Sequence, residues 1–561
     1  MRYVRDGGRV ALVALATLML PFTQARASQQ GALDPTWARD SPQGPGKVMT
    51  SIGGSNDSAH AIALQPDGKV LVTGTCYNGN YEFCVLRYNA NGTLDTSWSG
   101  TGTVITPMGA FEDGAFAIAV QPDGKVLVAG TCQSAYRVFC AVRYNANGSL
   151  DPGWNGTGKV MTQIAGNNGS SNATAMALQP DGKVLLAGYC AGGTNNDDFC
   201  ALRYQVDGTL DRTWNGTGKV ITPIGTSTDD AHAIALQTDG KVLLAGRCFA
   251  GTNNEFCVLR YRADGTLDTD WNGTGRVMSP IGSGSASAAA IAVQSDGKVL
   301  VAGECWSGTA SAFCMLRYQT DGNPDLSWNG SGKTITQIGS GGFASSLAVQ
   351  RDGKVLVAGE CFSGTTDFCT VRYNADGTLD TTWGAVGTGK VITPIASSHD
   401  QAFAMALQPD GKVLLAGGCI NSSNDFVFCA ARLDGDPPPP ACAVDLDGDG
   451  QVLATTDSLM HNRIALGLAD TAVTNGINFP PGAMRTSWSA INAYLVGKTL
   501  DIDGDGLTTS AVDSLIHIRV ALGITGSAAV SDITFAPTAT RKSWPLIRDY
   551  LVTQCGMLLT P

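Results

Sequence analysis

The chain has 561 residues, a formal net charge of −11 at pH 7, and 15% charged residues. Nucleic acid and anionic membrane surfaces would repel so acidic a protein, so neither is expected as its main partner. Beyond residue 27 no stretch is long and apolar enough to cross a bilayer, and we expect no integral membrane segment in the mature chain.

Residues 1–27 have the pattern of an export signal. Three arginines give a basic start, residues 10–22 form an apolar core too short to span a bilayer, and Ala25-Arg26-Ala27 has the form of a cleavage site. An uncleaved anchor is the alternative. The pattern predicts an exported protein that resides outside the cell, at the cell surface or in the periplasm.

Asp-Gly-Lys turns repeat along the chain at an almost fixed interval. They begin at Asp67, Asp123, Asp181, Asp239, Asp296, Asp352 and Asp410. A fixed period of this size indicates one supersecondary unit stacked many times. It also indicates that most of the recurring residues are structural, because a single active site needs its residues only once.

The first unit predicts four short strands, over residues 61–65, 69–76, 83–88 and 103–106. β-branched and apolar residues alternate in them, and Asp-Gly and Asn-Gly turns bound them. Proline at the end of the fourth strand, as at Pro107, places that strand on an edge, because proline cannot donate to a ladder. Four strands in each of seven units predict a mainly β fold, a seven-bladed β-propeller of four-stranded blades. An open β-solenoid is the alternative.

A second motif, Leu-Asp-x-x-Trp, is offset from the turns by half a unit. Its first copy, Leu33–Trp37, precedes the first Asp-Gly-Lys turn, and the array ends at Asp434, where the seventh unit would need a copy. We therefore expect the N-terminal segment to supply the outer strand of the last blade. The propeller, residues 28–434, would then have no unpaired end.

Fourteen of the 16 cysteines form one close pair per repeat. An even count behind an export signal favours disulfides, whereas zinc needs closer spacing and four converging ligands. We expect each pair to face across a hairpin between the second and third strands, with Cα atoms about 4.5 Å apart. The predicted disulfides are Cys76–Cys84, Cys132–Cys140, Cys190–Cys200, Cys248–Cys257, Cys305–Cys314, Cys361–Cys369, Cys419–Cys429 and, across the C-terminal domain, Cys442–Cys555.

The repeat resembles that of the delta-60 repeat proteins over about residues 33–434. The resemblance is carried by Arg372–Trp383, by the Gly-Lys-Val that follows, and by Gln-x-Asp-Gly-Lys-Val-Leu-x-Ala-Gly. It implies a bacterial, propeller-like protein with no agreed biochemical activity. The chain departs from that repeat by using Trp where Phe is common and by adding the cysteine pair.

A proline-rich linker, residues 435–441, leads to a region of loops and helices, residues 442–555, before a tail of residues 556–561. Asp445–Gly450 recurs as Asp501–Gly506, with acids at positions 1, 3 and 5 and glycine at 6, as in the first half of an EF-hand loop. Position 12 holds no acid, so the acid at position 13 is predicted to close a longer loop. The predicted ligands of two Ca²⁺ ions are Asp445, Asp447, Asp449, Gln451 and Asp457, and Asp501, Asp503, Asp505, Leu507 and Asp513, where Gln451 and Leu507 would offer backbone carbonyls.

Matched helices follow each loop, and residues 442–555 resemble a dockerin-type pair of calcium loops. The long loop and the long insert between the halves depart from cellulosomal dockerins, so the property that carries over is calcium binding. His461 and His517 occupy equivalent helical positions and are expected to pack rather than to catalyse.

No catalytic constellation stands out in the sequence. The segments between paired cysteines carry aromatic residues that we expect in a ring on one face of the propeller, where they could stack sugars or shield the disulfides. These residues are Tyr77, Tyr81, Tyr136, Phe249, Trp306 and Phe362.

The sequence favours a secreted, non-enzymatic binding or scaffold protein with a protein or glycan partner and a calcium-stabilised C-terminal interaction module. One alternative is an extracellular carbohydrate-active enzyme or accessory protein, a hydrolase or lyase in polysaccharide breakdown. Two acids from non-equivalent repeat positions that converge in the central pore would favour that enzyme. The other alternative is a structural or adhesion protein of the cell surface.

Overall fold

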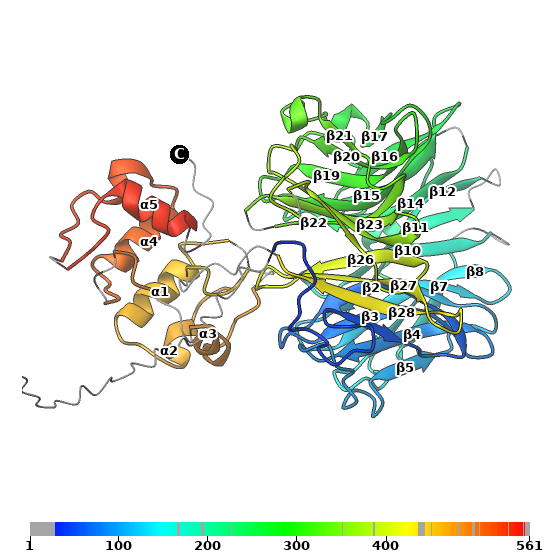
Figure 1. The fold of residues 1–561 in the computed structure, drawn as a ribbon, viewed down its shortest axis with the longest axis horizontal. Coiled ribbons are helices and arrows are strands. Elements are labelled where there is room, and N and C mark those ends of the chain that lie inside the picture. Colours follow the sequence, from blue (N-terminus) through cyan, green and yellow to red (C-terminus); the bar gives the residue numbers. More distant parts are fainter. Residues whose placement is uncertain are drawn as a thin grey trace, which may run out of the picture.

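The computed structural model describes residues 29–164, 166, 169–191, 196–225, 227–350, 352–384, 387–435, 444–449, 451–480, 483–495, 500–503, 505, 507–536, 538–553 and 555. The predicted export signal, most of the linker, Cys442 and the tail lie outside these residues. A β-propeller and a smaller group of helices make up the described chain (Figure 1). Every helix in the described part is too short or too polar to span a bilayer.

The propeller has seven antiparallel sheets of four strands, as predicted. Blade 1 consists of β2 (Ser55–Leu64), β3 (Val70–Tyr77), β4 (Tyr81–Tyr88) and β5 (Thr103–Thr106) in that order. The first strands of neighbouring blades contact one another around the axis, so β2 and its equivalents are innermost. Pro107 follows the last residue of β5, the outer strand, where no ladder bond is required of it.

The other blades repeat this arrangement. Blade 2 is β6 (Gly114–Val120), β7 (Val126–Gln133), β8 (Arg137–Tyr144) and β9 (Lys159–Thr162), and blade 3 is β10 (Ser171–Leu178), β11 (Val184–Ala191), β12 (Asp197–Tyr204) and β13 (Lys219–Thr222). Blade 4 is β14 (Asp229–Leu236), β15 (Val242–Phe249), β16 (Asn254–Tyr261) and β17 (Arg276–Ser279), and blade 5 is β18 (Ala286–Val293), β19 (Val299–Trp306), β20 (Ser311–Tyr318) and β21 (Lys333–Thr336). Blade 6 is β22 (Gly342–Val349), β23 (Val355–Phe362), β24 (Thr366–Tyr373) and β25 (Lys390–Thr393). Short 3₁₀ turns at Trp214–Gly216, Trp271–Gly273 and Trp328–Gly330 precede three of the outer strands.

Blade 7 joins the two ends of the array. Its order is β1-β28-β27-β26, with β1 (Lys47–Thr50) as the outer strand beside β28 (Phe426–Leu433), β27 (Val413–Ile420) and β26 (Asp400–Leu407). The prediction that the N-terminal segment closes the ring is confirmed. A buried cluster at the same junction binds Asp34 to Arg432 at 2.7 Å and to Lys412 at 2.7 Å.

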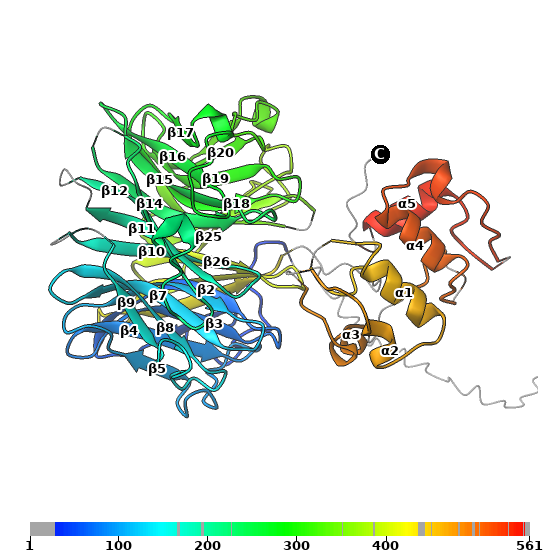
Figure 2. The same ribbon diagram turned by 180° about the vertical axis from the view of Figure 1, so that it is seen from behind.

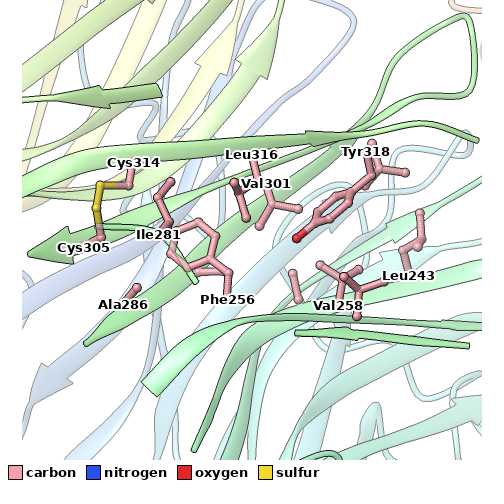
Figure 3. Packing of buried hydrophobic residues seen from close by; sticks show 14 of the residues in the cluster. Leu243, Phe256, Val258, Ile281, Ala286, Val301, Cys305, Cys314, Leu316 and Tyr318 are labelled. Carbon is pink, nitrogen blue, oxygen red and sulfur yellow. A yellow bond between two sulfur atoms is a disulfide. The ribbon is translucent and has the colours of Figure 1, made fainter. Parts of the chain in front are cut away.

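The tryptophans of the second motif fill the interfaces between blades. Trp98 is fully buried between blades 1 and 2, packs edge to face on Tyr144 at 6.2 Å, and lies under the Arg87 guanidinium. Arg87 forms a buried ion pair with Asp95 at 2.8 Å. The recurring Arg and Asp residues are therefore structural, as the sevenfold repeat predicted. Figure 3 shows the equivalent interface between blades 4 and 5.

The seven predicted disulfides within the propeller are present, and they fit an exported, non-cytoplasmic protein. Their expected geometry was wrong. Cys76 lies opposite Glu82, and Cys84 lies opposite Gly74, so the cysteines are diagonal neighbours with Cα atoms 5.8 Å apart. Gly74 is required because a Cβ there would lie 1.9 Å from the Ser58 carbonyl oxygen.

Replacing Cys190 and Cys200 together by alanine should lower the free energy of unfolding by about 2–3 kcal/mol, because the loop that their disulfide closes would regain entropy in the unfolded chain. Urea unfolding of both proteins under oxidising conditions measures the difference. Equal unfolding midpoints would contradict the prediction.

The C-terminal module is built from two matched halves (Figure 2). The first half contains α1 (Asp457–Ala465), α2 (Thr471–Thr474) and α3 (Trp488–Leu495), and the second contains α4 (Asp513–Ala521), a 3₁₀ turn (Gly526–Ala529) and α5 (Trp544–Thr553). Ile491 and Ile547 are fully buried in the core of their own half. The predicted pair Cys442–Cys555 falls partly outside the described residues.

Candidate functional site

One end of the propeller carries the hairpins that join the second and third strands of each blade. The loops that lead into the inner strands lie at the same end, since the Asp113 amide donates to the Tyr81 carbonyl. We call this end the hairpin face. The Asp-Gly-Lys turns lie at the opposite end, and there β28 ends and the chain leaves for the C-terminal module (Figure 1).

The predicted aromatic residues all lie on hairpins of this face, each hairpin belonging to one blade. Tyr77 and Tyr81 contact each other edge to face at 5.3 Å on blade 1. Phe362 of blade 6 contacts Phe343 edge to face at 5.8 Å, and Phe343 lines a cavity with Trp306 of blade 5. The aromatic side chains differ in exposure: Tyr77, Tyr136, Trp306 and Phe362 are 38–44% exposed, and Tyr81 and Phe249 are half-buried.

The cavity between blades 5 and 6 has a volume of about 400 Å³. Its walls include Glu304 and Trp306 at the end of β19, Ser285 in the loop before β18, and Phe343 near the start of β22. Phe343 was missed by sequence reasoning. It interrupts the repeat just before an alanine of the inner strand, a position that could have been compared across the units.

Acidic groups gather around this cavity. Burial raises the pKa of Glu304, and the nearby Glu360 carboxylate raises it further, while Arg247 opposes the shift. Burial likewise raises the pKa of Glu360, which accepts a hydrogen bond from Gln401. Glu304 and Glu360 occupy equivalent positions of neighbouring blades, so they do not match the non-equivalent pair that would have favoured an enzyme.

Near the axis, each inner strand has a bulge of one residue. In blade 1 this residue is His60, whose ring contacts Phe116 of blade 2 at 5.0 Å and Phe403 of blade 7 at 5.4 Å. Burial lowers the pKa of His60 to about 4. The imidazole therefore packs as a neutral ring between its two neighbours.

The two acidic loops of the C-terminal module have the same local geometry. Asp447 accepts the Asp449 amide at 3.1 Å, and Asp449 accepts the Gln451 amide at 2.7 Å, so each carboxylate folds back on the loop. Asp503 and Asp505 repeat both bonds. The structure brings together the carboxylates of Asp445, Asp447 and Asp449, and those of Asp501, Asp503 and Asp513, each set within 4.8 Å.

One carboxylate oxygen in each loop is buried without a partner. Asp447 Oδ2 and Asp503 Oδ2 receive no hydrogen bond within the described residues. Burial and the neighbouring charge of Asp457 raise the pKa of Asp447 to about 7, and burial and Asp513 raise that of Asp503 to about 6. Three clustered carboxylates with one unsatisfied oxygen in each loop could supply ligands to a hard cation.

The acids at position 13 have a clear hydrogen-bonding role. Asp457 Oδ1 accepts the amides of Leu446 and Asp447, and its Oδ2 accepts the Leu453 amide. Asp513 does the same for the second loop. Each acid thus fastens the start of its loop to the first turn of the helix, and its role as a closing metal ligand stays a prediction.

Two arginines that the sequence analysis overlooked support these loops. Arg485 donates to the carbonyls of Asp445 and Leu446, and its guanidinium lies 3.8 Å from the ring centre of Tyr494. Arg541 repeats this arrangement on the second loop and on Tyr550. The matched Arg-x-Ser-Trp segments before the two helices were the available signal.

His461 and His517 join the two halves of the module. Their rings stack at 4.6 Å, and each accepts a hydrogen bond at Nδ1 from a serine of the other half, Ser514 or Ser458. Each Nε2 donates to the carbonyl just before the other loop, that of Leu500 or Val444. Burial lowers the pKa of His461 to about 4, and burial with the charge of His461 lowers that of His517 to about 3.

Comparison with known proteins supports a repeat propeller. A family model described as "Domain of unknown function (DUF5122) beta-propeller" matches residues 65–97, 121–153, 179–213, 237–270, 294–327 and 350–382. In these six repeats the Asp-Gly-Lys turn is followed along the chain by the Leu-Asp motif of the same blade. The seventh is divided between the two ends of the array. None of the curated proteins compared matches the chain.

Solved structures of other proteins resemble the propeller at low identity. A protein of unknown function from Dyadobacter fermentans is 12% identical, with a TM-score of 0.34, over 70% of this chain and 100% of that one. Virginiamycin B lyase from Staphylococcus aureus is 10% identical, with a TM-score of 0.40, over 69% and 98%. A polysaccharide lyase of family PL25, an ulvan lyase, is 9% identical, with a TM-score of 0.40, over 69% and 96%. At these scores the likeness does not extend to ligands or chemistry.

Proposed function

We propose that the chain is an exported, non-enzymatic binding or scaffold protein. Its propeller would present the hairpin face to a ligand or partner outside the cell, at the cell surface or in the periplasm. Its C-terminal module would bind two Ca²⁺ ions and serve as a calcium-stabilised interaction module. The equivalent placement of Glu304 and Glu360 favours this binding role over polysaccharide cleavage.

The buried, unpartnered oxygens of Asp447 and Asp503 are the observation that carries the calcium proposal. Ca²⁺ takes six to eight oxygen ligands, and clustered carboxylates around a sharp turn supply them. The turn at Gly448 has φ +78°, and a Cβ there would lie 2.6 Å from the Arg485 guanidinium. Ca²⁺ bound at each loop would neutralise carboxylates that otherwise repel one another. Folding of the module and metal binding would then be linked.

Calcium titration of the full chain tests this proposal. Isothermal calorimetry should detect two Ca²⁺ per chain, and chelation should reduce the far-ultraviolet circular dichroism of the helices. Asp447→Asn and Asp503→Asn should each weaken one site by about tenfold or more, because each removes a ligand charge.

Asp532→Asn is the matched control, since Asp532 is an exposed acid of the same module outside both loops. Its calcium titration should equal that of the unmodified protein. A chain that binds no Ca²⁺, and whose helical signal ignores the chelator, would rule out the calcium module.

A further inference from the structure

The cavity between blades 5 and 6 combines an exposed aromatic wall with a carboxylate that has no partner. Trp306 is 44% exposed, while the seven tryptophans of the blade interfaces are fully buried. Glu304 lines the same cavity, and its carboxylate forms no hydrogen bond or ion pair with any residue that the structure describes. This half-buried carboxylate keeps contact with water, so it can exchange that water for the ammonium group of a ligand.

The other blades provide an internal control for these two features. The strand register pairs Ser287 with Glu304, and the positions equivalent to Glu304 are Thr75, Thr131, Tyr189, Arg247, Glu360 and Gly418. The positions equivalent to Phe343 are Ser58, Gly114, Asn172, Asp230, Ser287 and Gln401. Blade architecture therefore requires neither an acid nor a phenyl ring at these sites. Both positions vary from blade to blade, so the combination of Glu304 with Phe343 of the next blade is particular to this cavity.

The charge around the cavity is negative. The positive charge of Arg247 acts on Glu304, but the Arg247 guanidinium already forms an ion pair with Asp230 at 2.6 Å. Glu360 adds a second acid, whose buried Oε2 has no hydrogen-bond partner among the residues that the structure places. The raised pKa of both glutamates follows from burial in this setting. A positively charged ligand would relieve the repulsion between the two carboxylates, whereas an anionic ligand would increase it.

The aromatic walls distinguish between kinds of cation. Hard metal ions prefer a shell of oxygen atoms, and a cavity walled by indole and phenyl rings does not provide one. Organic ammonium groups are attracted both to aromatic faces and to carboxylates. The exposed indole also offers a flat apolar surface on which the carbon face of a sugar ring can stack.

We propose that the cavity binds an amino sugar of an extracellular glycan, with its free ammonium group at Glu304 and its ring against Trp306. A cavity of about 400 Å³ that is open to the hairpin face has room for a ring as well as for a charged group. This proposal deepens the binding role of the hairpin face and rests on it. It does not depend on calcium, because the cavity lies wholly within the propeller.

Binding to the full chain can be followed by tryptophan fluorescence and calorimetry, with glucosamine oligomers as the probe and fully N-acetylated oligomers as the neutral comparison. We expect the glucosamine oligomer to quench Trp306 and to bind at least about tenfold more tightly than the acetylated one, because acetylation removes the charge. A lysine-rich peptide tests the other source of ammonium groups. It is expected to bind more weakly than the glucosamine oligomer.

Glu304→Gln and Trp306→Ala should each weaken glucosamine binding by about tenfold or more. Glu304→Thr should do the same, and threonine already occupies this position in blades 1 and 2, so folding is preserved. Glu112→Gln removes an exposed acid of the hairpin face and should leave binding unchanged.

The proposal would be overturned by equal binding of the acetylated oligomer, by tighter binding of the lysine-rich peptide, or by a loss of affinity in Glu112→Gln equal to that in Glu304→Gln. Repeating the titration with chelator separates the two proposals. Glucosamine binding that persists without calcium supports this one even if the metal titration fails, and binding that disappears with calcium removal contradicts it.

Discussion

Replacing Trp37 by alanine is expected to lower the free energy of unfolding of the propeller by about 3–5 kcal/mol. The indole is fully buried between blades 7 and 1, where it packs edge to face on Tyr88 at 6.2 Å, and the Arg432 guanidinium lies over it. Gly92 packs so closely that a Cβ there would lie 2.7 Å from the ring. Alanine would leave a cavity where the two ends of the array meet. Urea unfolding followed by near-ultraviolet circular dichroism measures the loss.

Two other tryptophans serve as controls for this prediction. Trp214→Ala creates the same cavity between blades 3 and 4 and should cost a similar free energy, within about 1 kcal/mol. Trp306→Ala removes an exposed indole and should change the free energy of unfolding by about 0.5 kcal/mol or less. If Trp37→Ala behaved like Trp306→Ala, the N-terminal segment would not be part of the cooperative ring.

The closure of the ring was predictable because it follows from the number and order of the two repeated motifs. Seven turns, six Leu-Asp-x-x-Trp motifs and one variant at Pro324–Trp328, offset by half a unit, leave the last blade without an outer strand unless the first motif supplies it. Asp34 of the first motif pairs with Arg432 of the last blade. Burial raises its pKa, but hydrogen bonds from Lys412 and Thr36 and the charge of Arg432 outweigh burial and lower it to about 2. The last blade therefore has the same ion-pair chemistry as the other six.

The register of the disulfides could not be predicted from spacing. The number of residues between the cysteines varies from pair to pair, and hairpin turns of different length absorb the difference, while the Cα separation stays at 5.8–5.9 Å. Which residues face each other depends on the turn, so the sequence indicated a pairing but not its diagonal geometry.

The candidate ligand cavity was predicted only in part. Trp306 was a candidate from the sequence, but Phe343, which lines the same cavity, belongs to the next unit along the chain. Contacts between neighbouring blades join residues that occupy different positions of the repeat. Comparing the same position in all units therefore does not show which unusual residues contact each other. In the C-terminal module the acidic loops were evident, whereas the crossed bonds between His461 and Ser514 depend on how the two halves pack.

Acid is expected to destabilise the C-terminal module through its two buried histidines. Burial and the stacking of the two rings favour the neutral imidazoles in the folded state, with the proton on Nε2 because that nitrogen faces a carbonyl oxygen. Their pKa values are depressed from 6.5 to about 4 for His461 and about 3 for His517, so the unfolded chain binds more protons. Stability is full above pH 6.5 and falls below it by about 1.4 kcal/mol per pH unit for each histidine, until the folded values are reached.

The acidic loops respond to pH as well, so the measurement has to separate the two effects. Without metal, the raised pKa values of Asp447 and Asp503 act in the opposite direction, since protonation relieves the repulsion between carboxylates. Thermal unfolding of the module between pH 7.5 and 4.5 should therefore be compared at one saturating calcium concentration for the natural chain and for His461→Gln/His517→Gln. Glutamine keeps an N–H donor near the carbonyls of Leu500 and Val444 but does not titrate. The carboxylates contribute equally to both proteins, so a steeper loss in the natural chain isolates the histidines, and parallel curves would show that their burial does not control acid stability.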